Sequence, residues 1–301
     1  MMIKSKSTFK NPAEDHLFFK NWVSKLEKLN QTSYEQIDLN TSLGKTICWA
    51  INKSQPHLKT LVIFPGFRTC SLFWDFDNAL ENLKKMYRIF MIDTNGQPCL
   101  SEGNTPDIKS DGYGLWAAEV LEQLNIRKAV VAGASFGGLV CLKLAMIAPG
   151  LIEKVILLNP GCLRSFSLSF KNIYYNLLPL LAPSSKNVKK FLDNAVFCKP
   201  VHQLSTEAEK MLIDYEVFAL TRFTDKAQKP YSMDEDELRK VKGAVYLLVG
   251  DHDILFPYKK SLDRARSFIY GLQETFVLKN TGHGIETSKE AMSIIKHIME
   301  A

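Results

Sequence analysis

Apolar positions along the chain form short continuous runs, and stretches with helical spacing separate most of these runs. A short, unbroken apolar run is typical of a strand that is buried on both faces of a parallel sheet. Such runs occur at Leu61–Phe64, Ala129–Ala132, Val155–Leu158 and Ala244–Val249, and mostly apolar segments at Tyr87–Asp93 and Thr275–Leu278 are also expected to be strands. Helical spacing occurs at Phe73–Lys84, at Asp111–Leu124, from Ser135 to Ala148, at Tyr258–Tyr270 and in a C-terminal segment with Ala291, Ile294, Ile295 and Ile298 on one face. This alternation predicts an α/β fold with a mostly parallel, doubly wound sheet.

The first fifty residues carry different patterns. Tyr34–Leu39 and Lys45–Ile51 alternate between apolar and polar positions, which predicts an antiparallel hairpin at a sheet edge. Before the hairpin, Ala13–Leu29 has apolar residues at helical spacing with lysines between them; they are Phe18, Phe19, Trp22, Leu26 and Leu29. We interpret this segment as a helix docked on its own domain. The alternative is a basic amphipathic helix that makes peripheral contact with a membrane surface or lies on a partner.

The alternation of strands and helices stops between Cys162 and Tyr231, where no strand pattern occurs. Three helical stretches fill this region instead, at Lys171–Leu181, Lys186–Val196 and Thr206–Phe223. An all-helical insertion after the sixth strand, rich in aromatic residues, predicts a lid over the carboxyl edge of the sheet, where such sheets bind ligands. The alternative is a helical bulge with no role in ligand binding.

Two capping boxes are expected around this insertion. Thr206 and Glu209 have the spacing of a box at the start of its last helix, and Ser232 and Glu235 have the same spacing where the α/β alternation resumes. The predicted organisation is an N-terminal helical extension, an α/β core and a helical cap or lid. Their residue ranges are 1–33 for the extension, 34–161 with 232–301 for the core, and 162–231 for the lid.

Composition excludes several classes of protein. The 301 residues are 46% hydrophobic and 23% charged, as in an ordinary globular protein, and the net charge of +6 is scattered without a basic stripe. Nucleic-acid binding is therefore not expected. The N-terminus lacks the apolar region of a signal peptide and no run approaches 18 apolar residues, so we expect neither secretion nor membrane spanning. Six cysteines without a C-x-x-C pair indicate buried free thiols in a reducing compartment, and we expect a cytoplasmic protein.

The segment Gly133-Ala134-Ser135-Phe136-Gly137-Gly138 lies between an apolar strand and an apolar helix. A strand that turns abruptly into a helix needs small residues two positions before and two after the turn, and Gly133 and Gly137 supply them. Such a turn exposes the Ser135 hydroxyl and leaves the N–H of Phe136 at a helix N-terminus, where negative charge is favoured. The pattern predicts a serine nucleophile.

A serine nucleophile needs a base, and the base needs an acid that fixes its tautomer. Of the six histidines, His283 alone follows the last predicted strand in a glycine-rich loop. The preceding strand ends with two candidate acids, Asp251 and Asp253. We favour Asp253, because the apolar residues that follow it can exclude water, and we expect Asp251 to shape the turn. A metal site at Asp251-His252-Asp253 is the alternative, without a second ligand cluster to support it.

Acyl transfer also needs hydrogen-bond donors for the oxyanion of the tetrahedral intermediate. The N–H of Phe136 is one candidate, and the N–H of Phe67, in the loop after the Leu61–Phe64 strand, is the other. Arg68 follows and is interpreted as a solvated side chain, with binding of a substrate carboxylate as the alternative.

Together these residues resemble the α/β-hydrolase superfamily, specifically its lid-bearing, esterase-like serine hydrolases. The resemblance covers residues 34–161 and 232–301, with the insertion where that branch carries its cap. It implies that Ser135 in GASFGG is the nucleophile, Asp253 in GDHDILFP the acid and His283 in GHG the base. Phe67 and Phe136 resemble the donors of the oxyanion hole. Serine rather than aspartate at position 135 argues against dehalogenase and epoxide hydrolase chemistry.

Two loops depart from the pattern of that superfamily. Pro65-Gly66 stands where His-Gly is usual, and the segment Asp93–Ser101 lacks the second glycine of the usual D-x-x-G-x-G-x-S loop. These departures leave the shapes of both loops open at this stage.

The expected activity is hydrolysis of a carboxylic ester of a small or medium apolar substrate through an acyl-enzyme intermediate, without a cofactor or metal. One alternative is hydrolysis of a thioester, amide or carbon–carbon bond, or acyl transfer, on the same scaffold. A second is a protein that binds ligands without turnover, although a binding protein has no need of Ser135, Asp253 and His283 together. The oligomeric state is left open.

Overall fold

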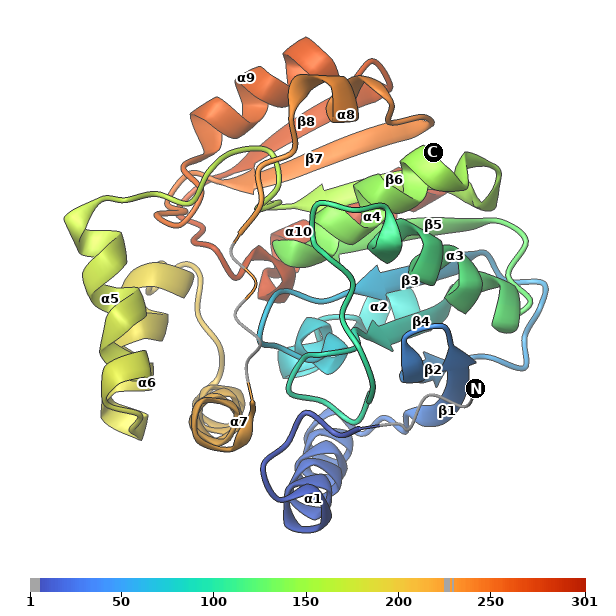
Figure 1. Ribbon diagram of the computed structural model, residues 1–301. Coiled ribbons are helices and arrows are strands. Elements are labelled where there is room, and N and C mark those ends of the chain that lie inside the picture. The colour runs from blue at the N-terminus through green and yellow to red at the C-terminus, as the bar shows by residue number, and fades with distance from the viewer. Residues whose placement is uncertain (1–5, 225–227, 229) are drawn as a thin grey trace.

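The computed structural model describes residues 6–224, 228 and 230–301, which fold around an eight-stranded sheet (Figure 1). The strands are β1 (Glu35–Thr41), β2 (Gly44–Ile51), β3 (Thr60–Phe64), β4 (Arg88–Asp93), β5 (Ala129–Ala134), β6 (Ile152–Leu158), β7 (Ala244–Gly250) and β8 (Leu272–Leu278). Their order in the sheet is β1-β2-β4-β3-β5-β6-β7-β8. β1 and β2 form an antiparallel hairpin at one edge, β2 is antiparallel to β4, and the other neighbours are parallel. The predicted sheet class and the edge hairpin are therefore confirmed.

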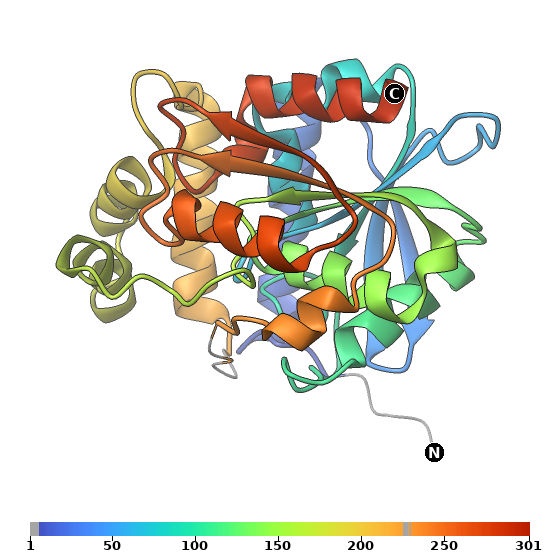
Figure 2. The ribbon, with the colours of Figure 1, turned by 90° about the horizontal axis from the view of Figure 1, so that it is seen from above.

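Helices cover both faces of the sheet. One face is packed by α1 (Pro12–Asn30), the 3₁₀ segment η1 (Ser71–Asn78), α2 (Glu81–Lys84) and α10 (Lys289–Glu300). The other is packed by α3 (Gly112–Gln123), α4 (Phe136–Ile147), α8 (Glu235–Arg239) and α9 (Tyr258–Phe268). Figure 2 shows α9 and α10 on opposite sides of the sheet. Every residue of the central strands β3 and β5 is buried, which is why their sequences are continuous apolar runs.

The insertion between β6 and β7 is helical in its described part. It contains α5 (Phe170–Leu181), α6 (Ser185–Phe191), the π-helical turn η3 (Leu192–Val196) and α7 (Thr206–Arg222). Figure 1 shows these helices beside the sheet, at the end where β6 leads into the insertion. Residues 1–5 of the predicted extension and 225–227 and 229 of the predicted lid lie outside the described residues.

Two local predictions are wrong. A single helix was expected over Phe73–Lys84, but η1 and α2 are separate, with Phe76 extended and Asp77 at φ 53°. The helix breaks because the Asp75 carboxylate accepts the N–H of Leu80 at 3.1 Å, a local side-chain bond that competes with helical pairing.

The expected helix caps are also displaced. Ser205, not Thr206, caps α7, and its side-chain oxygen accepts the N–H of Ala208. Ser205 is held in this position because the Asp77 carboxylate accepts both its N–H and its hydroxyl. At α8 the capping box joins Asp234 and Glu237, two residues after the predicted Ser232 and Glu235. Both helices thus begin beside the expected residues, at a neighbour that tertiary contacts favour.

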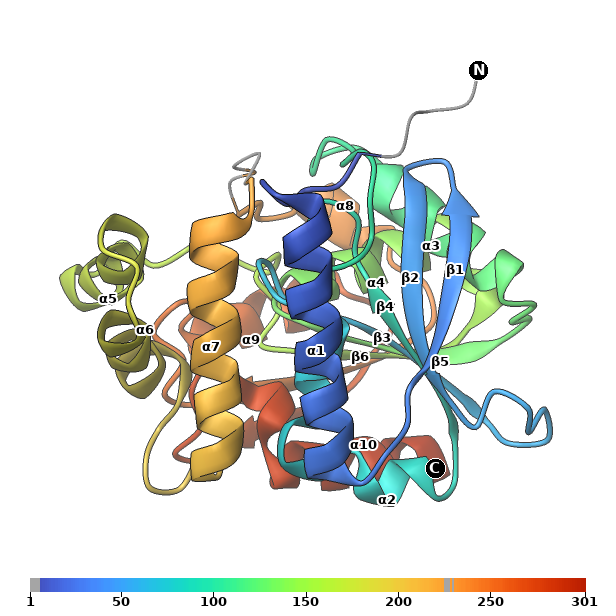
Figure 3. The ribbon, with the colours of Figure 1, turned by 90° about the horizontal axis from the view of Figure 1, so that it is seen from below.

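The N-terminal helix packs on its own chain. Phe19, Trp22 and Leu26 are buried against α7 and η1, and the Trp22 indole N–H donates to the Met211 carbonyl at 3.0 Å. Figure 3 shows α1 and α7 side by side. Phe18 and Leu29 are expected on the same face of the helix. They lie at the margin of that face, and their exposed fractions are 37% and 38%. Phe19, Trp22 and Leu26 of α1 are thus packed inside the molecule. This is the arrangement expected of a helix docked on its own domain. No helix in the described part of the chain has the length and hydropathy to cross a membrane.

A buried polar cluster fastens α1 to η1. The Asp75 side chain is fully buried, forms an ion pair with Lys84, and accepts the Tyr34 hydroxyl at 2.5 Å. Asn30, at the end of α1, donates to the Asp75 carbonyl at 2.6 Å and to the Tyr34 oxygen at 3.0 Å. Each buried polar group in this cluster is therefore satisfied by another member of the cluster.

Asp75→Ala is expected to reduce the free energy of unfolding by about 3–5 kcal/mol, because it leaves the Lys84 ammonium and the Tyr34 hydroxyl buried without their partner. The exposed pair Lys53–Glu35 provides the control, and Glu35→Ala is expected to cost about 0–1 kcal/mol. Urea unfolding of the three proteins measures both values. Equal stability of the Asp75 and Glu35 variants would contradict the assigned role of the buried cluster.

Candidate active site

Ser135 occupies the sharp turn between β5 and α4. Its backbone has φ 51° and ψ −109°, a conformation that non-glycine residues rarely adopt. Three backbone hydrogen bonds hold it there: the Ser135 N–H donates to the Leu158 carbonyl at 2.9 Å, and the Ser135 carbonyl accepts from Gly138 at 3.2 Å and from Gly161 at 3.1 Å. The neighbouring strand β6 and the loop after it therefore maintain the strained turn.

Two glycines flank this turn because there is no room for a side chain. A Cβ on Gly133 would lie 2.2 Å from the Gly137 carbonyl oxygen, and a Cβ on Gly137 would lie 2.1 Å from the carbonyl oxygen of Phe64. Both distances are far below van der Waals contact. The G-x-S-x-G spacing thus reflects the close approach of β5, α4 and the end of β3.

The structure brings Ser135, His283 and Asp253 together from three strand ends. His283 Nε2 lies 3.0 Å from Ser135 Oγ, and His283 Nδ1 lies 2.8 Å from Asp253 Oδ2. The other carboxylate oxygen, Oδ1, accepts the N–H groups of Leu255 at 2.8 Å and Phe256 at 3.0 Å. The Asp253 side chain is fully buried and that of His283 is 12% exposed. The hydroxyl, the imidazole and the carboxylate form one continuous hydrogen-bonded chain.

Asp251 points away from this chain. Its carboxylate pairs with the His252 ring at 2.6 Å and accepts the Thr281 N–H at 3.5 Å, so that it braces the turn after β7. Asp251 and Asp253 therefore contact different imidazoles and do not converge as metal ligands. Among the described residues no group of three or more histidine, cysteine, aspartate or glutamate side chains is arranged to hold a metal ion.

The pKa of His283 is raised above its usual value. Burial favours the neutral imidazole, but the charge of Asp253, its hydrogen bond and the charge of Glu286 together outweigh burial. Glu286, in the 3₁₀ turn after His283, has a pKa raised chiefly by its own burial. A carboxylate whose charge raises the pKa of this imidazole is an electrostatic feature that the sequence motifs did not reveal.

Asn159, just after β6, ties together the two loops that carry His283 and Asp253. Its amide nitrogen donates to the carbonyls of Gly282 and His283, both at 3.0 Å, and its amide oxygen accepts the Gly250 N–H at 2.9 Å. The sequence analysis did not single out this residue. The available signal was a side-chain amide directly after the apolar run Val155–Leu158, at the predicted ligand edge of the sheet.

The helical insertion also contacts the loop that carries His283. His202 accepts the Gly282 N–H on Nδ1 at 3.2 Å, and its Nε2 lies 3.0 Å from the Thr287 hydroxyl. Burial lowers the pKa of His202 to about 4, so that this ring is neutral at physiological pH. His202 is thus a buried structural residue.

The two candidate oxyanion donors lie beside Ser135. The rings of Phe67 and Phe136 meet edge to face at 5.8 Å, and a Cβ on Gly66 would lie 3.7 Å from the Ser135 Cβ. Gln97 fixes the loop of Phe67, since its side-chain oxygen accepts the N–H of Arg68 at 2.6 Å. The two loops that depart from the usual pattern are therefore hydrogen-bonded to each other. Gln97 is a second residue that sequence reasoning did not single out.

Ser135 and His283 open into a cavity of about 480 Å³. The insertion supplies much of its wall, and the side chains that contribute are mainly apolar; they include Ile173, Leu177, Leu180, Val188, Phe191, Leu192, Val196, Leu212 and Leu220. Glu216 and Glu286 are the acidic residues of the lining, and burial raises the pKa of Glu216 to about 8 although the charge of Arg68 opposes this shift. The cavity thus suits a ligand that is mostly apolar.

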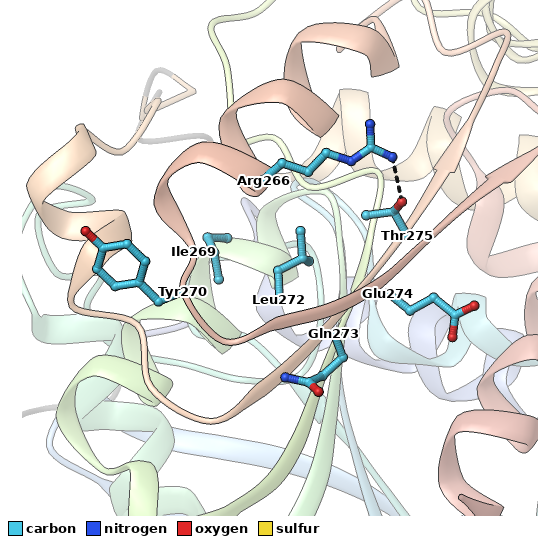
Figure 4. Close-up of a pocket in the computed structure, with 7 residues that line it drawn as sticks. All are labelled: Arg266, Ile269, Tyr270, Leu272, Gln273, Glu274 and Thr275. Atoms are coloured by element: carbon cyan, nitrogen blue, oxygen red, sulfur yellow. Dashed lines mark hydrogen bonds between the residues drawn. The ribbon is translucent and has the colours of Figure 1, made fainter.

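A second depression, of about 400 Å³, lies between the end of α9 and the start of β8 (Figure 4). Its lining includes Arg266, which donates to the Thr275 hydroxyl at 3.0 Å, and it contains no histidine, cysteine or serine. Because β8 begins there and is parallel to β7, this depression lies at the opposite edge of the sheet from Ser135. It offers no group for covalent chemistry comparable to the first cavity.

Comparison with known proteins gives the same fold. Residues 59–181 match the model of the family described as alpha/beta hydrolase fold. The chain superposes on the crystal structure of naproxen esterase (carboxylesterase NP) from Bacillus subtilis with a TM-score of 0.80 at 22% identity, covering 95% of this chain and 98% of that one. This chain has the α/β-hydrolase fold.

Relatives by sequence agree with the match to this family. The chain is 27% identical over 247 residues to the uncharacterized carboxylesterase Nap of Bacillus subtilis (strain 168), covering 81% of this chain and 79% of the relative. It is 21% identical over 250 residues to carboxylesterase YbfK of the same organism, covering 83% and 81%. The crystal structure of carboxylesterase CesB (YbfK) superposes with a TM-score of 0.77 at 18% identity, over 95% of this chain and 98% of that one.

Gly137→Ala is expected to lower the free energy of unfolding by about 1–3 kcal/mol, because the added methyl group would overlap the carbonyl oxygen of Phe64. Gly150→Ala is the matched control, since a Cβ there meets no atom within 4 Å, and its effect is expected to stay within about 0.5 kcal/mol. Chemical unfolding of both variants measures the difference. If Gly137→Ala were as stable as Gly150→Ala, the close approach at the turn would not constrain this position.

Proposed function

We propose that this α/β-hydrolase hydrolyses carboxylic esters of small or medium apolar acids through an acyl-enzyme intermediate on Ser135. The observation that carries the proposal is the hydrogen-bonded chain from Ser135 Oγ through His283 to the buried Asp253. The strained backbone of Ser135 and the mainly apolar cavity beside it support the same chemistry. The carboxylesterase relatives support the choice of an ester rather than another acyl compound.

In the first half of the reaction, Ser135 Oγ attacks the ester carbonyl carbon while its proton passes to His283 Nε2. The tetrahedral intermediate then expels the alcohol, which takes the proton from Nε2, and the acyl group stays on Oγ. In the second half, a water molecule gives a proton to Nε2 and attacks the acyl carbon. Collapse of the second intermediate returns the proton to Ser135 and releases the acid.

Asp253 has two tasks in this scheme. It keeps a proton on His283 Nδ1, so that Nε2 is free to accept the serine proton, and its charge stabilises the imidazolium that forms. The N–H groups of Leu255 and Phe256 hold the carboxylate in place for both tasks. The backbone N–H groups of Phe67 and Phe136 are proposed to stabilise the oxyanion, the latter at the N-terminus of α4.

The helical insertion is proposed to act as the lid of this site. Residues of α5, α6, η3 and α7 line the same cavity as Ser135 and His283, so that an ester bound at Ser135 would lie between the sheet and the insertion. Apolar walls favour an apolar acyl chain, and they exclude water from the charged groups that form during the reaction.

Ser135→Ala is expected to lower kcat for p-nitrophenyl hexanoate by about 10⁴–10⁶, because no other hydroxyl occupies the position hydrogen-bonded to His283. Ser165→Ala, an exposed serine of the insertion, serves as the control and is expected to retain full activity. Steady-state kinetics of the purified variants measures both values. Hydrolysis by the Ser135 variant within tenfold of the unmodified protein would exclude Ser135 as the nucleophile.

Asp253→Asn is expected to lower kcat by about 10⁴, because an amide at this position favours the wrong tautomer of His283. Asp251→Asn is the matched variant two residues away, and it is expected to change kcat less than about threefold and to cost about 1 kcal/mol of stability through its weakened turn bonds. Measuring kcat and Tm for both separates the two roles. Inactivity of the Asp251 variant together with an active Asp253 variant would reverse the assignment of the acid.

The pH profile of kcat/KM is expected to fall on the acid side as His283 becomes protonated, since only the neutral imidazole accepts the serine proton. Glu286→Gln removes a negative charge that raises the pKa of His283. The His283 imidazolium then loses stabilisation, so the pKa of His283 falls. The acid side of the kcat/KM profile should therefore move to lower pH. Glu290→Gln, at an exposed position on α10, is the control and should leave the acid side in place. An acid side that stays in place or moves to higher pH in the Glu286 variant would contradict this electrostatic role.

A further inference from the structure

Helix α5 of the insertion presents an apolar stripe to solvent. Phe170, Tyr174, Leu177 and Leu181 recur at the spacing of one helix face, and they are 85%, 46%, 45% and 80% exposed. Leu168, just before the helix, is 80% exposed as well. Figures 1 and 3 both place α5 at the outer margin of the molecule. Single exposed apolar residues are normal on a protein surface, but five on one short segment form a contiguous patch.

The same helix forms a wall of the cavity that contains Ser135. Ile173, Asn176 and Leu180 line the cavity, while Phe170 and Leu181 do not. Leu177 contributes to both surfaces, since it lines the cavity and is exposed to solvent. One helix thickness therefore separates the exposed stripe from the proposed substrate cavity.

The segment that carries the stripe is rich in positive charge. The segment 164–192 contains Arg164, Lys171, Lys186, Lys189 and Lys190 and no aspartate or glutamate. Lys189 forms ion pairs with Glu209 and Asp193. Lys171, Lys186 and Lys190 are exposed and make no ion pair with any residue that the structure describes. Exposed apolar side chains on a segment whose charged residues are all cationic are the pattern of a helix that lies in the interface of an anionic membrane.

From this arrangement we infer that the exposed face of α5, with Lys171, Lys186 and Lys190, docks on the surface of an anionic phospholipid bilayer. The apolar side chains enter the acyl boundary and the lysines contact the phosphate groups. A second copy of the chain fits the surface less well, because two such faces would bring their lysines together without opposing acids.

If the proposed function holds, docking of α5 on a membrane also determines how the substrate reaches the site. The wall of the cavity would face the bilayer, so that an ester dissolved in the lipid phase would reach Ser135 with little passage through water. The substrate class indicated is therefore an ester that partitions into membranes, rather than a water-soluble one.

Co-sedimentation with vesicles tests the docking itself. The full chain is mixed with vesicles of phosphatidylcholine and phosphatidylglycerol in equal parts, and with vesicles of phosphatidylcholine alone, at an ionic strength of about 0.1 M. We expect binding to the anionic vesicles that is at least tenfold stronger than binding to the neutral ones. Absence of binding to the anionic vesicles would overturn the inference.

Paired variants locate the contact. Phe170→Ser with Leu181→Ser is expected to weaken partitioning into anionic vesicles at least tenfold. Leu17→Ser with Tyr270→Ser, at positions 60% and 76% exposed on other elements, should not change it. Lys186→Gln with Lys190→Gln should remove most of the preference for anionic lipid, and Lys259→Gln with Lys260→Gln on α9 is the matched control. Unchanged binding of the Phe170/Leu181 variant would overturn the assignment of α5.

Two further measurements separate the explanations. If sedimentation velocity without vesicles shows a dimer that the Phe170/Leu181 variant abolishes, the surface belongs to self-association and the lipid assignment fails. Ser135→Ala should bind vesicles as the unmodified chain does, and the α5 variants should hydrolyse a soluble short-chain ester at the unmodified rate. Vesicle binding by a chain that hydrolyses no ester would refute the proposed function while leaving the docking surface intact.

Discussion

The close approach of β5, α4 and the end of β3 is the constraint on which the site depends. Backbone atoms of Gly133, Gly137 and Phe64 pack where a single added methyl group would overlap a carbonyl oxygen. That contact forces the chain to reverse within one residue, and Ser135 takes a strained conformation that three backbone hydrogen bonds maintain. A side chain in this position projects from the sheet toward the cavity. The packing of the buried strands β5 and β6 stabilises the strained backbone.

The parallel arrangement of the strands brings the remaining groups to the same place. β6, β7 and β8 end at one edge of the sheet, and the loops that follow them supply Asn159, Asp253 and His283. Asn159 bonds to both of the other loops, so that the positions of the carboxylate and the imidazole are coupled through one buried amide. Residues more than a hundred positions apart in the chain thereby meet within hydrogen-bonding distance.

Much of this arrangement could be predicted from the sequence, because its signals are local. Apolar runs indicate strands that are buried on both faces. The glycine spacing indicates the turn at Ser135, since there is no room for a side chain at either glycine. His283 could be selected because it alone of the histidines follows the last predicted strand in a glycine-rich loop, and Asp253 could be favoured over Asp251 because apolar residues follow it. The contact between His283 and Asp253 is a feature of the fold, and the catalytic roles of both residues belong to the proposed function.

Features set by tertiary contacts could not be predicted. Asp75 interrupts the expected helix because its carboxylate accepts a backbone N–H and pairs with a lysine. The spacing of apolar residues in the sequence does not indicate either contact. Ser205 caps α7 because Asp77 reaches it from another segment. Gln97 and Glu216 both interact with Arg68, which is distant in the sequence, and Glu286 approaches His283 through the 3₁₀ turn that follows it. The exposed stripe of α5 has the same apolar spacing as a buried helix, and only the fold shows that this face is left uncovered.

Labelling with a fluorophosphonate, followed by mass spectrometry of the digested protein, tests the assignment of the nucleophile most directly. The reagent modifies a serine hydroxyl only where a base and an oxyanion site activate it. A single adduct on the peptide that contains Ser135, lost when His283 is replaced by alanine, is the result predicted by the hydrogen-bonded chain of Ser135, His283 and Asp253. An adduct on a different residue, or labelling of Ser135 that persists without His283, would contradict it.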